Sequence, residues 1–518
     1  MPEKSFVMGV DIGTTSTKAT IFTTESHFVA SHTIEYPLFH PKTDYAEQDP
    51  NQIYQAVLDS IKLVIQRAKL HSSQLLGIGF SSAMHSVIAV DVDGHCLTNS
   101  ITWADNRSNE YAKRIKEEWN GHDIYLRTGT PIHPMSPLSK LMWFKEEAQE
   151  IFQKASKFIS IKEFVIWKWF NQYLVDYSIA SATGLFNLKA LDWDQEALDL
   201  IGISKERLSK PVPTTTILKE MDVKAATYMN VPVDIPVVIG ASDGVLANLG
   251  VGAIEPGKVA LTIGTSGAIR AVVNQPITDP TGRTFCYALT ENHWVIGGPM
   301  NNGGIALRWF KDQFSMTEVE MAKDRNKDVY DIMIEQAEKV QAGSNGLLFL
   351  PYLSGERAPS WNANARGVFF GMSITHQRQH FIRAILEGVI FGVYSIGKAL
   401  NELAGPASEI RVSGGFARSE VWRQITADIF QQKVIVPESH ESSGLGAAIL
   451  TMYALGLLTS LEESKHMIHV LNEQLPNRDH ADVYQELYQL FSTLSVQLNE
   501  SFDQISELQR KSFNKFEE

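Results

Sequence analysis

Hydrophobic and polar positions change their period twice within the first part of the chain. Three short runs rich in β-forming residues, 6–13, 16–22 and 31–37, are separated by turns of Gly, Thr and Ser. Such runs predict an antiparallel β-meander. From residues 50 to 70 the apolar residues recur every three or four positions, and Asp49 precedes them where a helix N-cap would stand. An amphipathic helix is therefore expected after the meander.

The next 100 residues mix both periods. Apolar runs at 75–82 and 86–91 predict two strands, and helical periods are expected at about 107–118, 139–154 and 161–172. At the other end of the chain, a segment rich in Gln, Glu and Leu predicts one terminal helix from about residue 478 to 518. The chain is therefore of the α/β class.

One strand-turn-strand pattern occurs twice. Residues 9–22, GVDIGTTSTKATIF, have an apolar strand, a Gly-Thr turn and a second apolar strand, and residues 259–273, VALTIGTSGAIRAVV, repeat that order. We interpret the repeat as an internal duplication, with the boundary at 250–256. The expected domains are residues 1–252 and 253–518.

Composition narrows the class of protein. At 518 residues the chain is long enough for two large domains or three smaller ones. Its formal net charge of -13 argues against a nucleic-acid surface and against a polybasic membrane patch. We also expect no secretion signal and no window of about 18 apolar residues to span a bilayer, so the predicted compartment is the cytoplasm. Cys96 and Cys286 are too few for a disulfide framework or a four-cysteine zinc site.

The two Gly-Thr turns are candidate phosphate cradles. The chain has no P-loop and no GxGxxG fingerprint between a strand and a helix. In residues 11–18 a glycine frees the backbone, amides and hydroxyls can donate to phosphate oxygens, Lys18 adds a positive charge, and Asp11 could hold magnesium through water. Residues 264–267 repeat the turn, so two hairpins facing one another would clamp a nucleoside triphosphate. Alternatively, each is an ordinary hairpin with a Gly-Thr turn.

Two longer motifs carry a resemblance to a known family. They are MSPLSKLMWFKEE at 135–147 and GVFFGMSITHQRQHFIRAILE at 367–387. Together with DIGTT, GASDG, GTSG and SGG in this order, they make nearly the whole chain resemble the FGGY carbohydrate kinases. The resemblance implies two ribonuclease H-like (actin-like ATPase) domains of duplicated origin around a central cleft. It also implies ATP and Mg²⁺ as cofactors.

The resemblance assigns roles to particular residues. Asp243 is the expected general base and, with Asp11, a metal ligand; the simpler alternative is that Asp243 only caps the helix that follows it. The expected substrate contacts are Met84, His85, Trp103, Asp105, Arg107 and Asp243. The expected ATP-binding residues are Gly13, Thr14, Thr15, Ser16, Lys18, Gly264, Thr265, Ser266, Gly304, Arg308, Gly414, Gly415 and Ser419.

Two segments indicate which sugar is phosphorylated. Ser81–Ser86 and PIHPMSPLSKLMW at 131–143 resemble the gluconokinase branch of the family. The expected reaction is the conversion of D-gluconate to 6-phosphogluconate. The substrate carboxylate could meet Arg107, Lys140 or His133, and for Lys140 a surface salt bridge or a hydrogen bond at the edge of the core is the favoured interpretation.

Other functions stay open at this point. A xylulokinase or another pentulose or polyol kinase of the same family is one alternative, and an actin-like ATPase or a non-catalytic sugar sensor is another. The expected partners are a small-molecule sugar or sugar acid and ATP, without nucleic acid or membrane, and a homodimer is left open. His376 and His380 have the spacing of a metal pair, but helix capping and packing explain them better because the glutamate of a zinc motif is missing.

Overall fold

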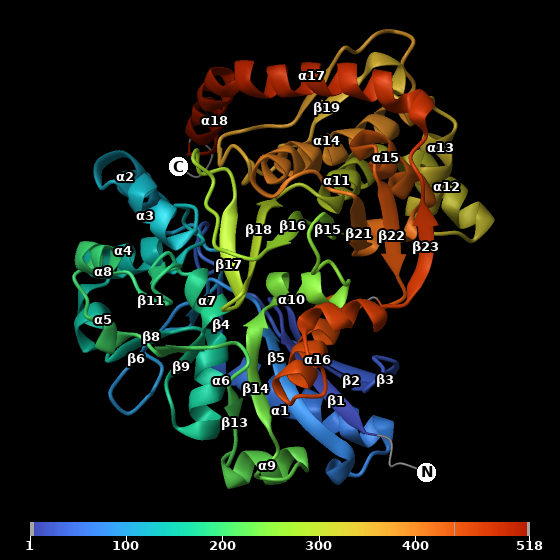
Figure 1. Ribbon diagram of the computed structural model, residues 1–518. Coiled ribbons are helices and arrows are strands. Elements are labelled where there is room, and N and C mark those ends of the chain that lie inside the picture. Colours follow the sequence, from blue (N-terminus) through green and yellow to red (C-terminus); the bar gives the residue numbers. More distant parts are fainter. Residues whose placement is uncertain (1–4, 440, 515–518) are drawn as a thin grey trace. The chain divides into compact units, whose positions relative to one another are not determined.

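The computed structural model describes residues 5–439 and 441–514, which pack as two compact units (Figure 1). The N-terminal unit contains the chain up to residue 256 together with 272–296 and 441–469. The C-terminal unit contains 257–271, 297–440 and the residues from 470 onward. The units are thus discontinuous in sequence, and a single division at residue 252 remains a proposal about the two family domains.

A six-stranded sheet organises the N-terminal unit, in the order β13-β14-β5-β1-β2-β3. The predicted meander is confirmed, because β1 (Phe6–Ile12), β2 (Ser16–Thr23) and β3 (Phe28–Glu35) pair antiparallel in sequence. The strands β5 (Leu75–Ser82) and β14 (Val237–Ser242) run parallel to β1, so all three end at the same edge. One edge strand is β13 (Ile217–Leu218), and β3 forms the opposite edge.

Helices cover both faces of this sheet. The predicted helix is confirmed as α1 (Pro50–Ala68), with the Asp49 carboxylate accepting from the Asn51 amide at 2.8 Å. It packs with Met8, Val10 and Ile12 of β1, whereas Val7 points to a second core shared with α10 (Asp243–Gly250) and α16 (Ser442–Ala454). Alternate residues of β1 therefore contact different layers.

Glycine in β1 allows α16 to approach closely. A Cβ added at Gly9 would lie 2.0 Å from the carbonyl oxygen of Gly444. Since no side chain tolerates that distance, the glycine holds the N-terminus of α16 against the strand that carries Asp11.

Further helices and short strands complete this unit. The helices include α2 (Asn109–Glu118), α3 (Gly121–Thr128), α4 (Pro137–Glu147), α5 (Gln149–Lys154), α6 (Ile161–Phe170), α7 (Tyr177–Ser181), α8 (Gln195–Ile201) and α9 (Val223–Met229). The strands include β4 (Glu47–Gln48), β6 (Ile88–Val90), β7 (Ser100–Ile101), β8 (Lys157–Ile159), β9 (Leu174–Asp176), β10 (Phe186–Asn187), β11 (Asp192–Trp193), β12 (Lys210–Val212) and β17 (Phe285–Thr290). The predicted strands at 75–82 and 86–91 and the helices near 107–118 and 161–172 are thus confirmed, whereas the single helix expected at 139–154 is divided into α4 and α5 at Ala148, whose backbone is not helical.

The C-terminal unit repeats the strand pattern of the first. In it β15 (Lys258–Ile263) pairs antiparallel with β16 (Gly267–Val273) and parallel with β21 (Glu409–Ser413). The sheet continues through β22 (Lys433–Pro437), parallel to β21, to the antiparallel strand β23 (Val470–Gln474). The order β16-β15-β21-β22 is that of β2-β1-β5-β14, as the duplicated sequence pattern predicts.

The long helix α14 (Arg378–Ala404) corrects one expectation. Among the described residues it is long and apolar enough to cross a membrane, with a mean hydropathy of 1.3 in its most apolar window, although no such window was expected. Since 72% of that window is buried inside the structure, the apolar residues serve the core of the unit. His380 caps the start of this helix, where its Nδ1 accepts from the Gln377 amide at 2.9 Å, which confirms a capping role.

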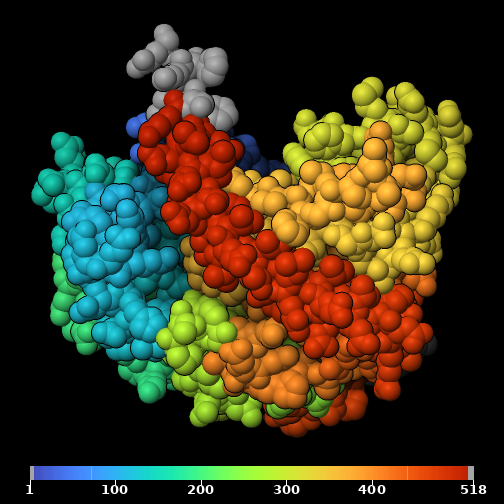
Figure 2. Space-filling model, turned by 90° about the horizontal axis from the view of Figure 1, so that it is seen from above, coloured from blue at the N-terminus to red at the C-terminus, as the bar shows by residue number. Residues whose placement is uncertain are grey.

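The end of the chain also differs from the prediction, because two helices replace the single one expected. They are α17 (Ala481–Gln497) and α18 (Asn499–Asn514), and they lie on the surface of the C-terminal unit (Figure 2, red). Other elements of this unit are α11 (Gly304–Phe314), α12 (Met316–Arg325), α13 (Val329–Glu338), α15 (Glu420–Phe430), β19 (Leu348–Leu350), β20 (Val368–Phe370) and the C-terminal half of β18 (His293–Met300).

Candidate active site

Two predicted acidic residues stand at the common edge of β1, β5 and β14. Asp11 is near the end of β1, and the Ser81 hydroxyl on β5 donates to its Oδ1 at 2.6 Å. Asp243 directly follows β14. Burial of the Asp11 carboxyl, with the negative charges of Asp243 and Glu441 nearby, raises its pKa from 3.8 to about 6. A carboxylate held among like charges is the environment that a divalent cation would relieve.

Asp243 is not the N-cap of the helix that follows it. Ser242 holds that position, and Asp243 is the first helical residue of α10, with its Oδ1 accepting from the Gly244 amide at 2.6 Å. The alternative that Asp243 is the N-cap residue of this helix is therefore wrong. A carboxylate in the first turn still benefits from the positive end of the helix dipole.

Buried polar groups hold the strand end in front of Asp243. The Lys162 ammonium donates to the carbonyl oxygen of Ala241 at 3.1 Å and pairs with the Asp176 carboxylate at 2.6 Å. The Ser178 and Ser242 hydroxyls lie 3.0 Å apart. These contacts fix the backbone immediately before Asp243, so its carboxylate projects from a firmly held strand end.

The first Gly-Thr turn is tied to a predicted sugar-side residue. The Gly13 amide donates to the carbonyl oxygen of Ser16 at 2.9 Å and closes the β1-β2 turn. The indole of Trp103 donates to the Thr14 hydroxyl at 2.8 Å. Of the other predicted residues in this turn, Thr15 is exposed and Ser16 is partly buried. A hydrogen bond thus joins the predicted phosphate-binding turn to the segment around Trp103, a predicted substrate contact.

Glu441 is a residue that the sequence patterns missed. Both of its carboxylate oxygens accept from the Lys18 ammonium at 3.0 Å, and it precedes α16. No local motif marks Glu441, because its partner is more than 400 residues away. The predicted phosphate-binding lysine is therefore already neutralised by a carboxylate.

Asp105 and Arg107 form a buried ion pair with each other. The Asp105 carboxylate is fully buried and accepts from Arg107 Nε at 2.9 Å and Nη2 at 2.8 Å, and from the Ala46 amide at 2.7 Å. The guanidinium also contacts Glu47 at 2.5 Å and stacks 3.7 Å from the centre of the Tyr45 ring. Because its carboxylate is buried and paired, Asp105 is not exposed for direct contact with a sugar. The positive charge of Arg107 is already balanced by the carboxylates of Asp105 and Glu47 and is not available to a substrate carboxylate.

The remaining predicted substrate residues lie after β5. Met84 is partly buried, whereas His85 is 7% exposed and has a left-handed backbone with φ of 70°. Its Nδ1 lies 2.7 Å from the carbonyl oxygen of Ala182, which makes Nδ1 the protonated nitrogen. His133 is also partly buried, and its Nδ1 accepts from the Met135 amide at 3.1 Å.

The C-terminal unit contains a cavity of about 720 Å³ at its own Gly-Thr turn. Six of the predicted ATP-binding residues line it, namely Gly264, Thr265, Gly304, Arg308, Gly415 and Ser419. The Gly304 amide donates to the carbonyl oxygen of Gly264 at 2.7 Å, and Arg308 lies 3.4 Å from the Thr265 hydroxyl. The start of α11 therefore meets the turn, where the Arg308 guanidinium and the Thr265 hydroxyl can bind phosphate.

Two predicted residues at this site, Ser266 and Gly414, do not line the cavity. A Cβ at Gly414 would lie 2.4 Å from the carbonyl oxygen of Ile263, and its φ is 90°, so this glycine is needed for strand packing. Ser419, which does line the cavity, is also the N-cap of α15 and accepts from the Trp422 amide at 3.2 Å. Sequence patterns missed other residues that line the cavity, among them Lys327, Tyr330, Asp331, Ile334, Glu335, Phe416 and Trp422.

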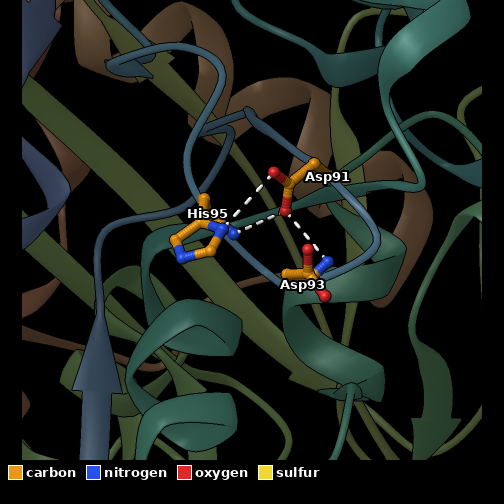
Figure 3. Close-up of side chains that lie close together, drawn as sticks. All are labelled: Asp91, Asp93 and His95. Carbon is orange, nitrogen blue, oxygen red and sulfur yellow. Dashed lines mark hydrogen bonds and ion pairs between the residues drawn. The ribbon is translucent and has the colours of Figure 1, made fainter.

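One group of possible metal ligands lies elsewhere in the described chain (Figure 3). Asp91, Asp93 and His95 stand on a tight turn, where Asp91 Oδ1 accepts from the backbone amides of the other two at 3.0 and 2.8 Å. The His95 ring lies 3.4 Å from the Asp91 carboxylate. Hydrogen bonds within the turn account for this cluster.

Comparison with known proteins identifies the family. The N-terminal domain of the FGGY family of carbohydrate kinases matches residues 6–250, and its C-terminal domain matches residues 259–455. The chain belongs to the FGGY family. Among FGGY proteins, the gluconokinase of Bacillus subtilis (strain 168) is 52% identical over 98% of both chains. The xylulose kinase of the same organism is 27% identical over 94% of this chain and 96% of its own.

Solved FGGY structures share the fold. The crystal structure of gluconate kinase from Lactobacillus acidophilus matches with a TM-score of 0.91 and 37% identity, covering 97% of this chain and all of the other. A ligand-bound structure from that organism described as xylulose kinase matches with the same values. The predicted fold class, two ribonuclease H-like (actin-like ATPase) domains, is confirmed by this likeness.

Proposed function

We propose that this protein is an ATP-dependent kinase that converts D-gluconate to 6-phosphogluconate. One observation carries the choice of substrate, namely 52% identity to the Bacillus subtilis gluconokinase over 98% of both chains. A second gluconokinase, from Bacillus licheniformis, has the same identity over the same share. The likeness to xylulose kinases is far weaker in sequence, at 27 to 28%.

Asp243 is the proposed general base. Its carboxylate takes the proton of the substrate hydroxyl as the hydroxyl oxygen attacks the γ-phosphorus, the bond to the bridging oxygen of ATP breaks, and ADP leaves. The rigid strand end and the first helical turn hold this carboxylate in one direction. The reaction requires the nucleotide and the sugar to bind next to each other. The central cleft that the family resemblance implies would allow this, and it stays a prediction.

The nucleotide is proposed to occupy the 720 Å³ cavity of the C-terminal unit. The guanidinium of Arg308 and the hydroxyl of Thr265 suit phosphate oxygens, whereas the amides of Gly264 and Gly304 already donate to carbonyl oxygens of the turn. Gly13, Thr14 and Lys18 of the first Gly-Thr turn stay predicted ATP-binding residues. Phe416, Trp422 and Tyr330 offer apolar surface for a base.

Mg²⁺ is the proposed metal, and the donor set fits it. Asp11 and Asp243 supply the carboxylate oxygens that this ion prefers, and burial followed by the negative charge of Asp243 raises the pKa of Asp11, so a cation there would stabilise its ionised form. When bound, the ion would neutralise charge on the phosphates. We propose that the enzyme acts in the cytoplasm on small molecules alone, in keeping with the net charge of -13, and a homodimer stays a prediction.

A pentulose kinase is the second candidate. The observation in its favour is that a structure described as xylulose kinase matches the fold as well as a gluconate kinase does. Coupled measurement of ADP formation with gluconate, xylulose, ribulose, glycerol and no sugar separates the candidates. Gluconate should give the highest kcat/KM. Fastest turnover with xylulose would overturn the substrate, and equal turnover without any sugar would overturn the kinase assignment.

A further inference from the structure

The structure assigns Lys140 a positioning role in sugar binding: its buried ammonium joins the backbone of His85 to that of Met135. Lys140 lies in the first turn of α4 and is completely buried. Its Nζ donates to the carbonyl oxygen of His85 at 2.8 Å and to that of Met135 at 2.6 Å. This inference rests on the proposed function, because His85 is a predicted sugar contact.

Burial rules out a direct role for Lys140. None of its surface is exposed, so a bound sugar could not reach the ammonium in this conformation. This corrects two of the interpretations offered by the sequence, since Lys140 is neither a surface salt bridge nor a cation available to a carboxylate. The third interpretation, a structural hydrogen bond, agrees with its bonds to two backbone carbonyls, although the residue lies fully inside the core. A fully buried lysine is rare unless partners satisfy it, and here the ammonium donates to two backbone carbonyls of the described chain.

The two carbonyls belong to segments that lie far apart in the sequence. His85 follows β5, and Met135 immediately precedes Ser136 and α4. Lys140 thus bonds at the same time to a residue 55 positions before it and to one five positions before it. Because the backbone of His85 is left-handed, with φ of 70°, it needs an external contact to hold it.

The His85 side chain is fixed independently of its backbone. Its Nδ1 contacts the carbonyl oxygen of Ala182 at 2.7 Å, and its ring packs edge-on to Tyr287. Lys140 therefore orients the main chain while Ala182 orients the imidazole. Loss of the ammonium should let residues 84–85 shift relative to Met135, and the shift should reach the sugar and not the nucleotide.

The charge state of Lys140 agrees with this role. Burial, partly offset by Asp105, lowers the pKa of its ammonium to about 7. Both the charged and the neutral amine carry at least two hydrogens, so both can donate to two carbonyls. A bridge made in either form keeps the site intact across neutral pH.

The test is steady-state kinetics of Lys140→Met and Lys140→Gln. Methionine keeps the shape of the side chain but has no donor, whereas glutamine keeps two amide hydrogens on a side chain about one bond shorter. We expect the KM for gluconate to rise at least tenfold in Lys140→Met and by a smaller but measurable factor in Lys140→Gln, whose shorter side chain cannot reach both carbonyls equally well. The KM for ATP should stay within twofold of wild type in both variants.

Phe144→Leu is the matched control, because Phe144 lies on the same helix and packs in the apolar core. Thermal unfolding of all variants separates lost stability from lost positioning. An unchanged gluconate KM in Lys140→Met, or an equal rise in Phe144→Leu at equal loss of Tm, would overturn the inference. If Lys140→Met does not fold, Lys140→Gln decides, and an unchanged gluconate KM there overturns it.

The kinetic results distinguish a wrong substrate assignment from a wrong role for Lys140. If wild-type protein does not phosphorylate gluconate but uses another sugar of the panel, the proposed substrate is wrong, and the Lys140 variants are measured with that sugar. If wild type uses gluconate and the variants keep its KM, only the role of Lys140 is wrong.

Discussion

Replacing Asp11 by Asn is expected to stabilise the protein and to abolish its kinase activity. The pKa of Asp11 is raised from 3.8 to about 6 by burial and then by Asp243. Each pKa unit corresponds to about 1.4 kcal/mol, so the ionised carboxylate costs the folded state on the order of 3 kcal/mol at neutral pH. Asparagine removes the charge and can still accept from the Ser81 hydroxyl, which lies 2.6 Å from Oδ1.

The sign of the pH dependence follows from the raised pKa. Well below pH 3.8 the carboxyl is protonated in both folded and unfolded states, so Asp11 costs nothing. Between pH 4 and 6 the folded state binds more protons than the unfolded state, and the cost of Asp11 grows until it is complete above the folded pKa of about 6. The advantage of Asp11→Asn should therefore grow from pH 5 to pH 7, by roughly 1 kcal/mol.

Chemical denaturation of both proteins at pH 5 and 7, without nucleotide or Mg²⁺, measures this difference. The exposed Asp234, replaced by Asn, is the control for removing one negative charge from an acidic chain. Added Mg²⁺ should stabilise wild type more than Asp11→Asn, because the variant lacks the proposed ligand. A variant no more stable than wild type at pH 7, or a difference that does not change with pH, would refute the electrostatic argument.

Three further substitutions test other parts of the site. Asp243→Asn should lower kcat at least about 10²-fold with gluconate binding largely intact, and near-normal turnover would remove Asp243 from the mechanism. Arg107→Met should lower the free energy of unfolding by roughly 3 kcal/mol, because Asp105 would stay buried without its counter-charge. Normal stability with a raised gluconate KM would instead make Arg107 a substrate cation. Gly304→Val should raise the KM for ATP about tenfold, equivalent to about 1.4 kcal/mol, since a Cβ there lies 2.8 Å from the Gly264 oxygen. An unchanged KM for ATP would exclude this turn from nucleotide binding.

Local sequence determined much of the fold. The meander at 6–35, the Asp49 cap of α1 and the duplicated β15-β16 hairpin depend on short-range periodicity and on turn residues, which act within a few positions. The Gly-Thr pattern also predicts Gly264 and Thr265 as phosphate-binding candidates, and both residues line the cavity of the C-terminal unit. Such features are predictable because the physical causes lie within one element.

Tertiary structure decided how the charged residues are used. The sequence predicts that Arg107 and Lys140 could each bind a substrate carboxylate. In the structure, however, Arg107 is paired with Asp105, and Lys140 is buried and hydrogen-bonded to two backbone carbonyls. Glu441 could not be recognised at all, because only the packing of α16 against β1 brings it to Lys18. A pattern of residues determines which groups can ionise or donate, whereas burial and partners from distant segments determine which of these groups remain free for a ligand.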